Sequence, residues 1–572
     1  MSTKIQYSNT WLPTTAKEVE ARGWKELDVI LFSGDAYVDH PSFGIPVIGR
    51  VLEKMGLKVA IVAQPNWQDD LRDFKKLGRP RLFFGVSSGS MDSMVNHYTA
   101  NRRLRSDDAY TPGGRAGFRP DYAAYVYAKN LKKLFPDVPV ILGGIEASLR
   151  RFTHYDYWSD SLKPSILAET GADMLVYGMG EKTIQKITQG LIDGKKITEL
   201  TGIPQTSFLT TKDFIPASGS ITIASHEECT KSKKVFGTMF RTVEEDSNSM
   251  EQRQIIQPFA DRQIVVNPPE SLSTEQELDE IYDLPFTRLP HPRYRDKVIP
   301  AYEMIRHSVN IHRGCFGGCS FCTISAHQGK FISSRSEKSV LKELEQVAAM
   351  PDFTGQVSDL GGPSANMYRM QGVNLEICKK CKRYSCIHPS VCKNLNTDHT
   401  PLNLLYDKAA KVPGIKKITI GSGVRYDLFL DNPQKQYEAS HRKYFEKLFL
   451  NHVSGRLKVA PEHTSDEVLK LMRKPSFDLF VKLKSWFDSL NRKHRKNQQL
   501  IPYMISNHPG CRIQDMADLA VKTNNLGYRL EQVQGFTPTP MTLSSVMFYT
   551  GIDPYTQKTV HISRSKDEMQ HQ

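Results

Sequence analysis

The chain has 572 residues, of which 39% are hydrophobic and 24% are charged, a balance that excludes a fibrous or wholly disordered protein. Basic side chains exceed acidic ones, and the formal net charge is +14. Residues 1–300 hold equal numbers of both kinds, so the whole excess lies in residues 301–572 and the chain has at least two unlike parts. Such an excess favours an anionic partner or substrate, of which nucleic acid is one.

Targeting signals and membrane spans are not expected. The N-terminal residues MSTKIQYSNTWLPTT contain no apolar stretch long enough for a signal sequence. No run of about 18 apolar residues occurs, and the mean hydropathy is −0.44. We therefore expect a soluble, cytoplasmic protein without a membrane span. Nine cysteines in a long chain without a secretion signal argue against a disulfide scaffold.

Residues 1–25 are expected to form a leader, and residues 26–195 an alternating α/β domain. The apolar run 28–33 suits a buried parallel strand, and a helix that ends at Gly56 and a second strand are predicted after it. Further strands are predicted at 81–87, 138–144 and 172–178, and helices at 122–135 and 181–193. This alternation predicts a doubly wound parallel sheet, in which ligands bind beyond the carboxyl ends of the strands.

The loops at those strand ends resemble the cobalamin-binding type of Rossmann domain that precedes some radical enzymes. The resemblance rests on residues 140–148 and 177–181, and the missing G-x-G-x-x-G fingerprint argues against a nicotinamide cofactor. The pattern that ligates cobalamin is Asp-x-His-x-x-Gly, whereas this chain has Asp39, His40 and Gly44, with the histidine one place early. Tight strand–helix turns explain the glycines, and we favour that explanation over cobalamin binding.

Residues 196–295 are predicted to bridge two domains. The segment is polar and rich in proline, which favours extended pieces wrapped over another surface. One short helix is expected near 274–283, with an N-cap in the region 273–276. A second folded domain is expected over 296–556, followed by a polar tail over 557–572.

Seven of the nine cysteines lie between residues 315 and 392, and three of them form a distinctive pattern. Cys315, Cys319 and Cys322 are spaced C-x3-C-x2-C, with Phe321 before the last and glycines in the loop. Three thiolates on a tight loop can hold three irons of a [4Fe–4S] cube and leave the fourth iron open to a small chelating molecule. Structural zinc prefers four closed ligands in paired knuckles and fits this spacing poorly. We therefore predict a [4Fe–4S] cluster.

This pattern resembles the signature of the radical S-adenosylmethionine (SAM) superfamily, CxxxCxφC with φ aromatic. Residues 357–363 resemble the strand end that meets the methionine amino group of SAM. The resemblance implies that Gly361, Gly362 and Pro363 bind this cofactor, through backbone carbonyls because the family's glutamate is missing. Residues 416–425, 457–472 and 502–510 resemble later strands of the same core. No residue is assigned a catalytic role.

Nearly the whole chain resembles the YgiQ family of radical SAM proteins, on residues 34–44, 268–292 and the cysteine region. The resemblance implies a partial (β/α)6, TIM-like barrel that holds cluster and SAM at its strand ends. It further implies that the reduced cluster passes one electron to SAM, which yields methionine and a 5′-deoxyadenosyl radical that abstracts a substrate hydrogen. The resemblance supplies no substrate.

A second cysteine group has the pattern C-x2-C-x4-C-x5-C and consists of Cys378, Cys381, Cys386 and Cys392. Four thiols in so short a stretch can close a tetrahedral zinc site or hold an auxiliary iron–sulfur cluster. Neighbouring lysines and Arg383 favour the thiolate form. The spacing does not separate zinc from iron–sulfur, and both stay open.

The sequence therefore predicts a radical SAM enzyme that takes electrons from an external one-electron reductant of the flavodoxin or ferredoxin kind. The basic half indicates an anionic substrate, with RNA as one candidate. The alternative is a nucleic-acid-binding protein with a structural cluster or zinc ion and no radical chemistry. An open iron argues against this alternative, because a structural cluster gains nothing from an unliganded iron.

Overall fold

The structure is a computed structural model and describes residues 11–530, 533–565, 568–569 and 572. Residues 1–10 of the expected leader and residues 566–567 and 570–571 of the expected tail lie outside this range. Contacts divide the chain into two compact units. The N-terminal unit comprises residues up to 232, 252–271 and 283–306, and the C-terminal unit comprises 233–251, 272–282 and 307–572. Within the described ranges, no helix has the length and apolarity needed to cross a bilayer.

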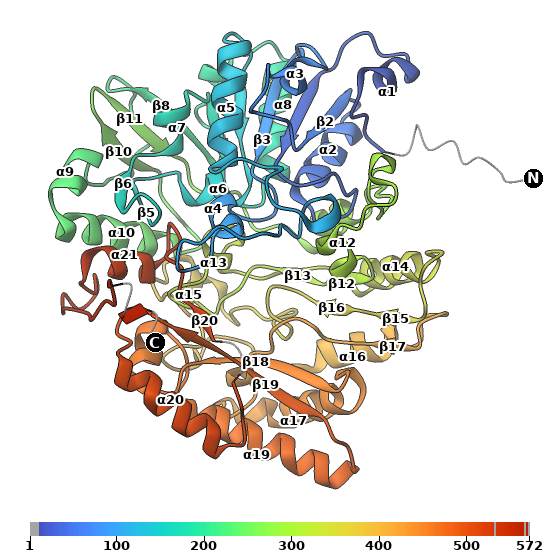
Figure 1. The fold of residues 1–572 in the computed structure, drawn as a ribbon, viewed down its shortest axis with the longest axis vertical. Coiled ribbons are helices and arrows are strands. Elements are labelled where there is room, and N and C mark those ends of the chain that lie inside the picture. The colour runs from blue at the N-terminus through green and yellow to red at the C-terminus, as the bar shows by residue number, and fades with distance from the viewer. Residues whose placement is uncertain (1–10, 531–532, 566–567, 570–571) are drawn as a thin grey trace, which may run out of the picture. The chain divides into compact units, whose positions relative to one another are not determined.

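A mainly parallel sheet organises the N-terminal unit (Figure 1). Its parallel strands are β1 (Val29–Ser33), β2 (Val59–Ala63), β3 (Phe83–Ser87), β4 (Val140–Leu142) and β7 (Met174–Val176). They lie in the order β2-β1-β3-β4-β7, so the direction of winding reverses between β1 and β3. Every residue of β1, β2 and β3 is buried, as expected for parallel strands covered on both faces. The strands predicted from apolar runs are confirmed.

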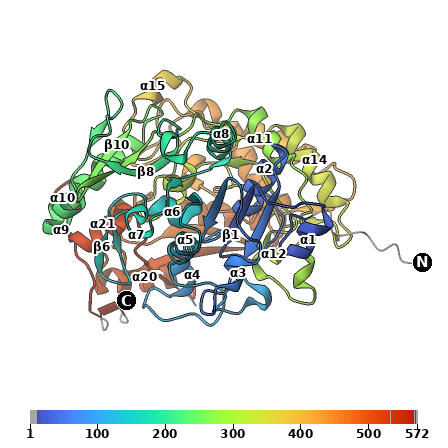
Figure 2. The ribbon, with the colours of Figure 1, turned by 90° about the horizontal axis from the view of Figure 1, so that it is seen from above.

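Helices cover both faces of this sheet. Figure 2 shows α2 (Gly44–Lys54) and α8 (Glu181–Ile192) on one side of β1, and α3 (Arg72–Lys75) and α5 (Ala123–Leu134) on the other. The predicted helices are confirmed, and Gly56 has a φ of 84°, the left-handed conformation expected just after α2. The shorter elements of this stretch are α1 (Ala16–Ala21), α4 (Ser93–His97), α6 (Gly144–Leu149), α7 (Ile166–Thr170), β5 (His154–Asp156) and β6 (Ser161–Lys163).

The segment expected to bridge two domains extends the same sheet. β8 (Thr206–Thr211) pairs antiparallel with β7, and β11 (Arg262–Val266) pairs antiparallel with β8. β10 (Ile255–Phe259) pairs antiparallel with β11, and β9 (Ile221–Thr222) lies parallel to β10 at the edge of the sheet. Helices in and after this stretch are α9 (His226–Lys231), α10 (Lys233–Ser247), α11 (Glu275–Tyr282) and α12 (Pro300–Ile305). α11 confirms the helix expected near 274–283, and its cap is Thr274, whose Oγ accepts from Glu277 N at 3.2 Å. The expected domain limits stay predictions.

The C-terminal unit alternates parallel strands with helices. β12 (Ser308–Asn310) pairs with β16 (Asp359–Gly361), β15 (Gln356–Val357) with β17 (Lys417–Ile418), β18 (Arg456–Glu462) with β19 (Gln499–Ser506), and β19 with β20 (Gln534–Gly535). The helices between and after them are α14 (Glu337–Ala348), α16 (Thr400–Ala409), α17 (Glu438–Lys447), α18 (Asp466–Met472), α19 (Phe477–His494), α20 (Ile513–Asn525) and α21 (Leu543–Thr550). Val309, Leu360, Val459 and Met504 share one buried core. This is the arrangement of a partial barrel, and the predicted fold class is confirmed.

Candidate metal centre

The first cysteine group lies on a loop that starts directly after β13 (His312–Arg313), a short strand paired with β14 (Ser333–Ser334). α13 (Ile324–Gln328) follows the last cysteine and leads the chain back to β14. Gly314 and Gly318 have φ values of 87° and 65°, in the left-handed region that favours glycine. A Cβ on Gly318 would lie 2.2 Å from the carbonyl oxygen of Tyr384. The loop therefore needs glycine to turn so tightly.

Burial is the main influence on these thiols. It raises the pKa of Cys322 to about 12 and that of Cys315 above its ordinary value, and the neighbouring thiolates raise the pKa of Cys322 further. Thiols in this state become thiolates when a metal replaces the proton, so metal binding and deprotonation are coupled here.

An arginine whose side chain is 11% exposed opposes that repulsion. Arg425 Nη1 donates to Cys319 Sγ at 3.4 Å, while its Nε and Nη2 donate to the carboxylate of Asp427 at 3.0 and 2.5 Å. Burial raises the pKa of Asp427, but the charge and hydrogen bonds of Arg425 outweigh it, and the pKa lies below its ordinary value. The pair therefore holds a fixed cation against the cysteine loop without leaving a buried charge uncompensated.

The donor set fits a cubane cluster. Among the residues that the structure describes, no group of three or more His, Cys, Asp or Glu side chains could hold a single metal ion. In a [4Fe–4S] cube each thiolate binds a different iron, so the sulfurs need not converge on one point. A Cβ on Gly317 would lie 3.3 Å from Cys315 Sγ and 2.6 Å from Arg425 Nη1, so the bare glycine leaves room beside the thiol. Three thiols, a glycine backbone and a fixed cation suit the predicted cluster.

The predicted SAM-binding residues lie at the end of β16. The carbonyl of Gly361 accepts from Ile311 N at 2.8 Å, so the strand end is tied to the chain between β12 and β13. Gly362 lies against the His312 ring, since a Cβ there would be 2.7 Å from Cε1. β13 leads directly into the first cysteine loop. The structure thus brings Gly361, Gly362 and the cysteine loop to neighbouring strand ends, while the contact of residues 361–363 with SAM stays a prediction.

The second cysteine group lies between β16 and α16, on and after α15 (Leu375–Lys379). Backbone hydrogen bonds join the four cysteines in two pairs, since Cys381 N donates to Cys378 O at 3.3 Å and Cys392 N donates to Cys386 O at 2.7 Å. Burial raises the pKa of Cys386 to about 11, and the ammonium of Lys330 acts against this rise. Whether the group holds a metal stays a prediction.

Sequence reasoning missed Arg425, Asp427 and Lys330. The first two form an Arg-x-Asp pair at the end of the predicted strand segment 416–425, after its glycines, and this pair is a readable signal. Lys330 follows the first cysteine loop by eight residues and gives no such signal, because a lysine is ordinarily exposed.

The carboxyl edge of the N-terminal sheet is the other place where the fold predicts a ligand. At the winding reversal between β1 and β3, Gly34 N donates to Ser87 O at 3.1 Å. Cβ atoms on Gly34 and Gly89 would lie 2.0 Å from Ser88 O and 2.1 Å from Asp35 Oδ1. The cavity at this edge has a volume of about 10 Å³, which is room for roughly one water molecule. The crevice is closed by the chain itself.

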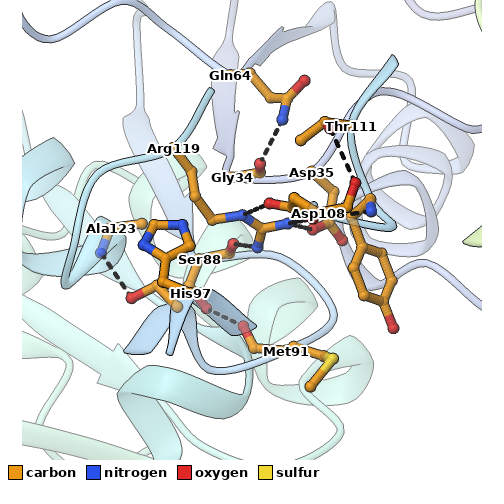
Figure 3. Close-up of polar contacts among 12 residues, drawn as sticks. Gly34, Asp35, Gln64, Ser88, Met91, His97, Asp108, Thr111, Arg119 and Ala123 are labelled. Carbon is orange, nitrogen blue, oxygen red and sulfur yellow. Dashed lines mark hydrogen bonds and ion pairs between the residues drawn. The ribbon is translucent and has the colours of Figure 1, made fainter. Parts of the chain in front are cut away.

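The loop that follows α4 fills this edge (Figure 3). Arg119 is buried, donates to Ser88 O at 2.9 Å, and pairs with Asp108 at 2.9 Å and Asp35 at 3.1 Å. Burial raises the pKa of Asp35, and the charge of Arg119 and hydrogen bonds from Ser90 oppose this rise. These side chains satisfy one another instead of facing a ligand.

The residues at this edge do not fit cobalamin. A corrin ring needs open space at the strand ends, and the Arg119 network occupies that space. His40, the residue closest to the ligation pattern, is 1% exposed, and its Nδ1 accepts from Ser42 N at 3.1 Å. Burial lowers the pKa of His40 well below its ordinary value. The imidazole is therefore enclosed, and we assign no chemistry to cobalamin.

Known proteins match the chain over almost its full length. The family described as Radical SAM N-terminal matches residues 11–308. A UPF0313 protein of Bacteroides thetaiotaomicron is 60% identical, with 98% of this chain and 92% of that protein covered. A UPF0313 protein of Methanocella arvoryzae is 46% identical, with 97% and 90% covered.

Two solved structures match with low scores. The radical SAM methyltransferase TsrM from Kitasatospora setae, with cobalamin and a [4Fe–4S] cluster bound, is 14% identical, with a TM-score of 0.47 over 90% of this chain and 74% of that one. The cobalamin-dependent SAM radical enzyme OxsB, with aqua-cobalamin bound, is 11% identical, with a TM-score of 0.46 over 87% and 52%. These likenesses are too distant to assign a ligand to this chain.

Proposed function

The chain belongs to the UPF0313 (YgiQ) family of radical SAM enzymes, and on that premise we propose that Cys315, Cys319 and Cys322 bind a [4Fe–4S] cluster whose fourth iron binds SAM. The observation that carries the proposal is the loop itself, in which three thiols stand beside a bare glycine backbone and Arg425 donates to Cys319 Sγ at 3.4 Å. Reductive cleavage of SAM, directed at an unidentified substrate, is the function that this arrangement supports best.

When bound, the cluster and SAM supply a one-electron reduction of the sulfonium that yields methionine and a 5′-deoxyadenosyl radical. The three thiolates would hold three irons and leave the fourth without a protein ligand. Arg425 would stabilise the more negative, reduced state through its hydrogen bond to the Cys319 thiolate. Phe321 packs on the barrel core and lies edge-on to His508, with ring centroids 6.0 Å apart, and so shields this side of the loop from water.

We assign Gly361, Gly362 and Pro363 to the amino-acid end of SAM, because backbone carbonyls can accept hydrogen bonds from an ammonium. Asp359 does not replace the missing glutamate of this segment. Its carboxylate already accepts from Gly421 N at 2.9 Å and from the Ser422 hydroxyl. Recognition of the amino group therefore falls to the strand-end carbonyls.

The partners of this chemistry follow from charge and redox state. Each cleavage consumes one electron, which supports an external reductant of the flavodoxin or ferredoxin kind. An anionic substrate, with RNA among the candidates, is supported by the net charge of +14, all of it in residues 301–572.

Nine free cysteines support a cytoplasmic location. The second cysteine group is proposed as a further metal centre, zinc or iron–sulfur.

Anaerobic reconstitution, reduction and incubation with SAM test the proposal. The wild type should form 5′-deoxyadenosine, and Cys319→Ala should form none above background, because the cluster loses one of three protein ligands. Cys229→Ala is the matched control, since this buried thiol lies on α9 of the other unit. No 5′-deoxyadenosine from a wild type with a spectroscopically intact cluster would contradict radical chemistry and favour the nucleic-acid-binding alternative.

A further inference from the structure

Residues 362–399, between β16 and α16, form a long and irregular segment that carries the second cysteine group. α15 accounts for five of its residues. A loop of this length keeps one conformation when something besides backbone hydrogen bonds ties it down. We propose that the four thiols of Cys378, Cys381, Cys386 and Cys392 bind a second metal centre, and that this centre fixes the segment as a wall of the first cysteine loop. The second half of this statement rests on the proposed function of that loop.

The four thiols have the surroundings of metal ligands. Asn394 Nδ2 donates to Cys378 Sγ at 3.4 Å, and hydrogen bonds of this kind orient sulfurs that bind metal. A Cβ on Gly372 would lie 2.5 Å from the same sulfur, so a glycine is needed beside it. As in the first group, the described side chains do not converge on one point for a single ion, so their arrangement favours four cluster irons, one on each thiolate, and a zinc ion would require the side chains to turn inward. In either case four thiolates leave no open position, unlike the first group. The shared chemistry is a closed, four-thiolate centre.

A buried lysine indicates that this group carries negative charge. Lys330 is 4% exposed, and its Nζ donates to the carbonyls of Asn248, at 3.2 Å, and Arg383. Both acceptors are neutral, whereas a buried ammonium needs an anion nearby. The charge of Lys330 acts on Cys378 and Cys386. Four thiolates on a zinc ion or on a [4Fe–4S] cluster carry a net charge of about −2, which four neutral thiols do not.

The same segment forms a wall of the first cysteine loop. The carbonyl of Phe316 accepts from Cys386 N at 3.1 Å and from Ser385 Oγ at 3.3 Å. Gly318 passes so close to Tyr384 that a Cβ would lie 2.2 Å from its carbonyl oxygen. Phe316 also packs in one apolar cluster with Cys386. Cys386 is thus a ligand of one centre and a backbone support of the other, and metal at the second centre fixes the Cys386 N–H that donates to the carbonyl of Phe316.

Metal analysis after anaerobic purification tests the second centre. The triple variant Cys315→Ala/Cys319→Ala/Cys322→Ala should retain about one zinc or about four irons per chain. Zinc identifies a structural ion and iron with a [4Fe–4S] Mössbauer signature identifies a cluster, and either result supports the proposal. The fully loaded wild type, which needs no substitution to fold, should carry the same metal in addition to the first cluster. Trace metal in the triple variant, together with about four irons and no zinc in the wild type, would overturn it.

The variant Cys381→Ser/Cys392→Ser provides the complementary measurement. It should lose the metal that the triple variant retains, because two of four ligands are gone. Unchanged metal in this variant would place the centre elsewhere and overturn the assignment. These readouts are metal contents and do not depend on SAM cleavage, so a failure of the proposed radical chemistry leaves them interpretable.

Ser385→Ala tests the wall without touching a thiol. The Ser385 hydroxyl donates to Phe316 O and accepts from Ile387 N at 3.1 Å and His388 N at 3.0 Å, so its loss loosens the wall. Iron of the first site should pass to a chelator roughly fivefold faster than in the wild type, the factor typical of one lost neutral hydrogen bond. The triple variant, which keeps only the second metal, gives the release rate of that metal, and this contribution is subtracted to obtain the rate for the first site.

Ser390→Ala is the matched control, because this serine is exposed in the same segment. It should release first-site iron at the wild-type rate. A wild-type rate in Ser385→Ala as well, with the second metal retained, would overturn the role of the segment as a wall.

Discussion

Arg425 sets the charge beside the first cysteine loop through its hydrogen bond to Cys319 Sγ at 3.4 Å. Arg425→Gln keeps a donor but removes the positive charge. Because reduction adds a negative charge to the cluster, we expect the midpoint potential to fall by roughly 60 mV, about tenfold in the equilibrium constant. A redox titration followed by electron paramagnetic resonance measures this. Arg442→Gln, at an exposed arginine of α17, should leave the potential unchanged, and an equal shift in both variants would contradict the role of Arg425.

At the same scale, the residues that could be predicted are those whose type alone limits their chemistry. The cysteines and the glycines of the first loop belong to this class, since few side chains bind iron and only glycine fits a carbonyl 2.2 Å from its Cβ position. Arg425 and Lys330 do not belong to it. Lys330 is buried and the Arg425 side chain is 11% exposed, against the usual preference of their residue types, because Arg425 pairs with Asp427 and Lys330 donates to carbonyls of residues distant in sequence. Such pairing leaves no periodic trace.

The loop after α4 depends on Arg119, which lies between the buried carboxylates of Asp35 and Asp108. Arg119→Met leaves both carboxylates without their cation. We expect the free energy of unfolding of the N-terminal unit to fall by about 3–5 kcal/mol. Urea unfolding followed by circular dichroism measures the change. Arg115→Met, at an exposed position of the same loop, should cost less than about 0.5 kcal/mol, and equal losses in the two variants would show that the buried pairing is not the cause.

The closed strand edge also predicts how the N-terminal unit responds to cobalamin. Hydroxocobalamin mixed with the wild type should keep its free absorption spectrum and separate from the protein in gel filtration. The reason is steric, since the edge cavity of about 10 Å³ is far smaller than a corrin. A stoichiometric complex would contradict the closed edge, and its loss in His40→Ala would identify the ligand.

Elements were predictable where one pattern runs without interruption. β1 is apolar in four of five positions and buried throughout, so its run could be read directly. β10 contains Pro258, which pairs with Gln263 of β11, and a proline inside a run argues against a strand. The polar, proline-rich composition of residues 196–295 predicts a bridge, whereas the structure extends the sheet there by β8 to β11. β15 and β17 have two residues each, too few to show any period.

At the scale of the molecule, the division into units follows contacts rather than chain order. Residues 233–251 belong to the C-terminal unit although the chain on both sides belongs to the N-terminal one. In this segment α10 packs against α21, and the buried Arg473 donates to the carboxylate of Glu244 at 2.7 and 3.0 Å, while Tyr555 OH donates to it at 2.6 Å. These partners lie far along the chain from Glu244. Domain limits predicted as one continuous range of residues per domain therefore cannot describe these units, since each unit consists of several separate ranges.

Buried histidines make the stability of the C-terminal unit depend on pH. Burial lowers the pKa of His399 and of His508 to about 3, whereas an unfolded histidine titrates near 6.5. Above pH 6.5 the imidazoles are neutral in both states, and between pH 6.5 and 3 the unfolded chain alone takes up the protons. The free energy of unfolding should therefore decrease as the pH is lowered through that window, by roughly 1.4 kcal/mol per pH unit for each histidine.

Guanidinium unfolding of the apoprotein at pH 7.5 and 5.0 measures the loss, since this range lies above the titration of ordinary carboxylates. His399→Gln should show a smaller loss than the wild type, and equal stability of the wild type at the two pH values would contradict the buried neutral state.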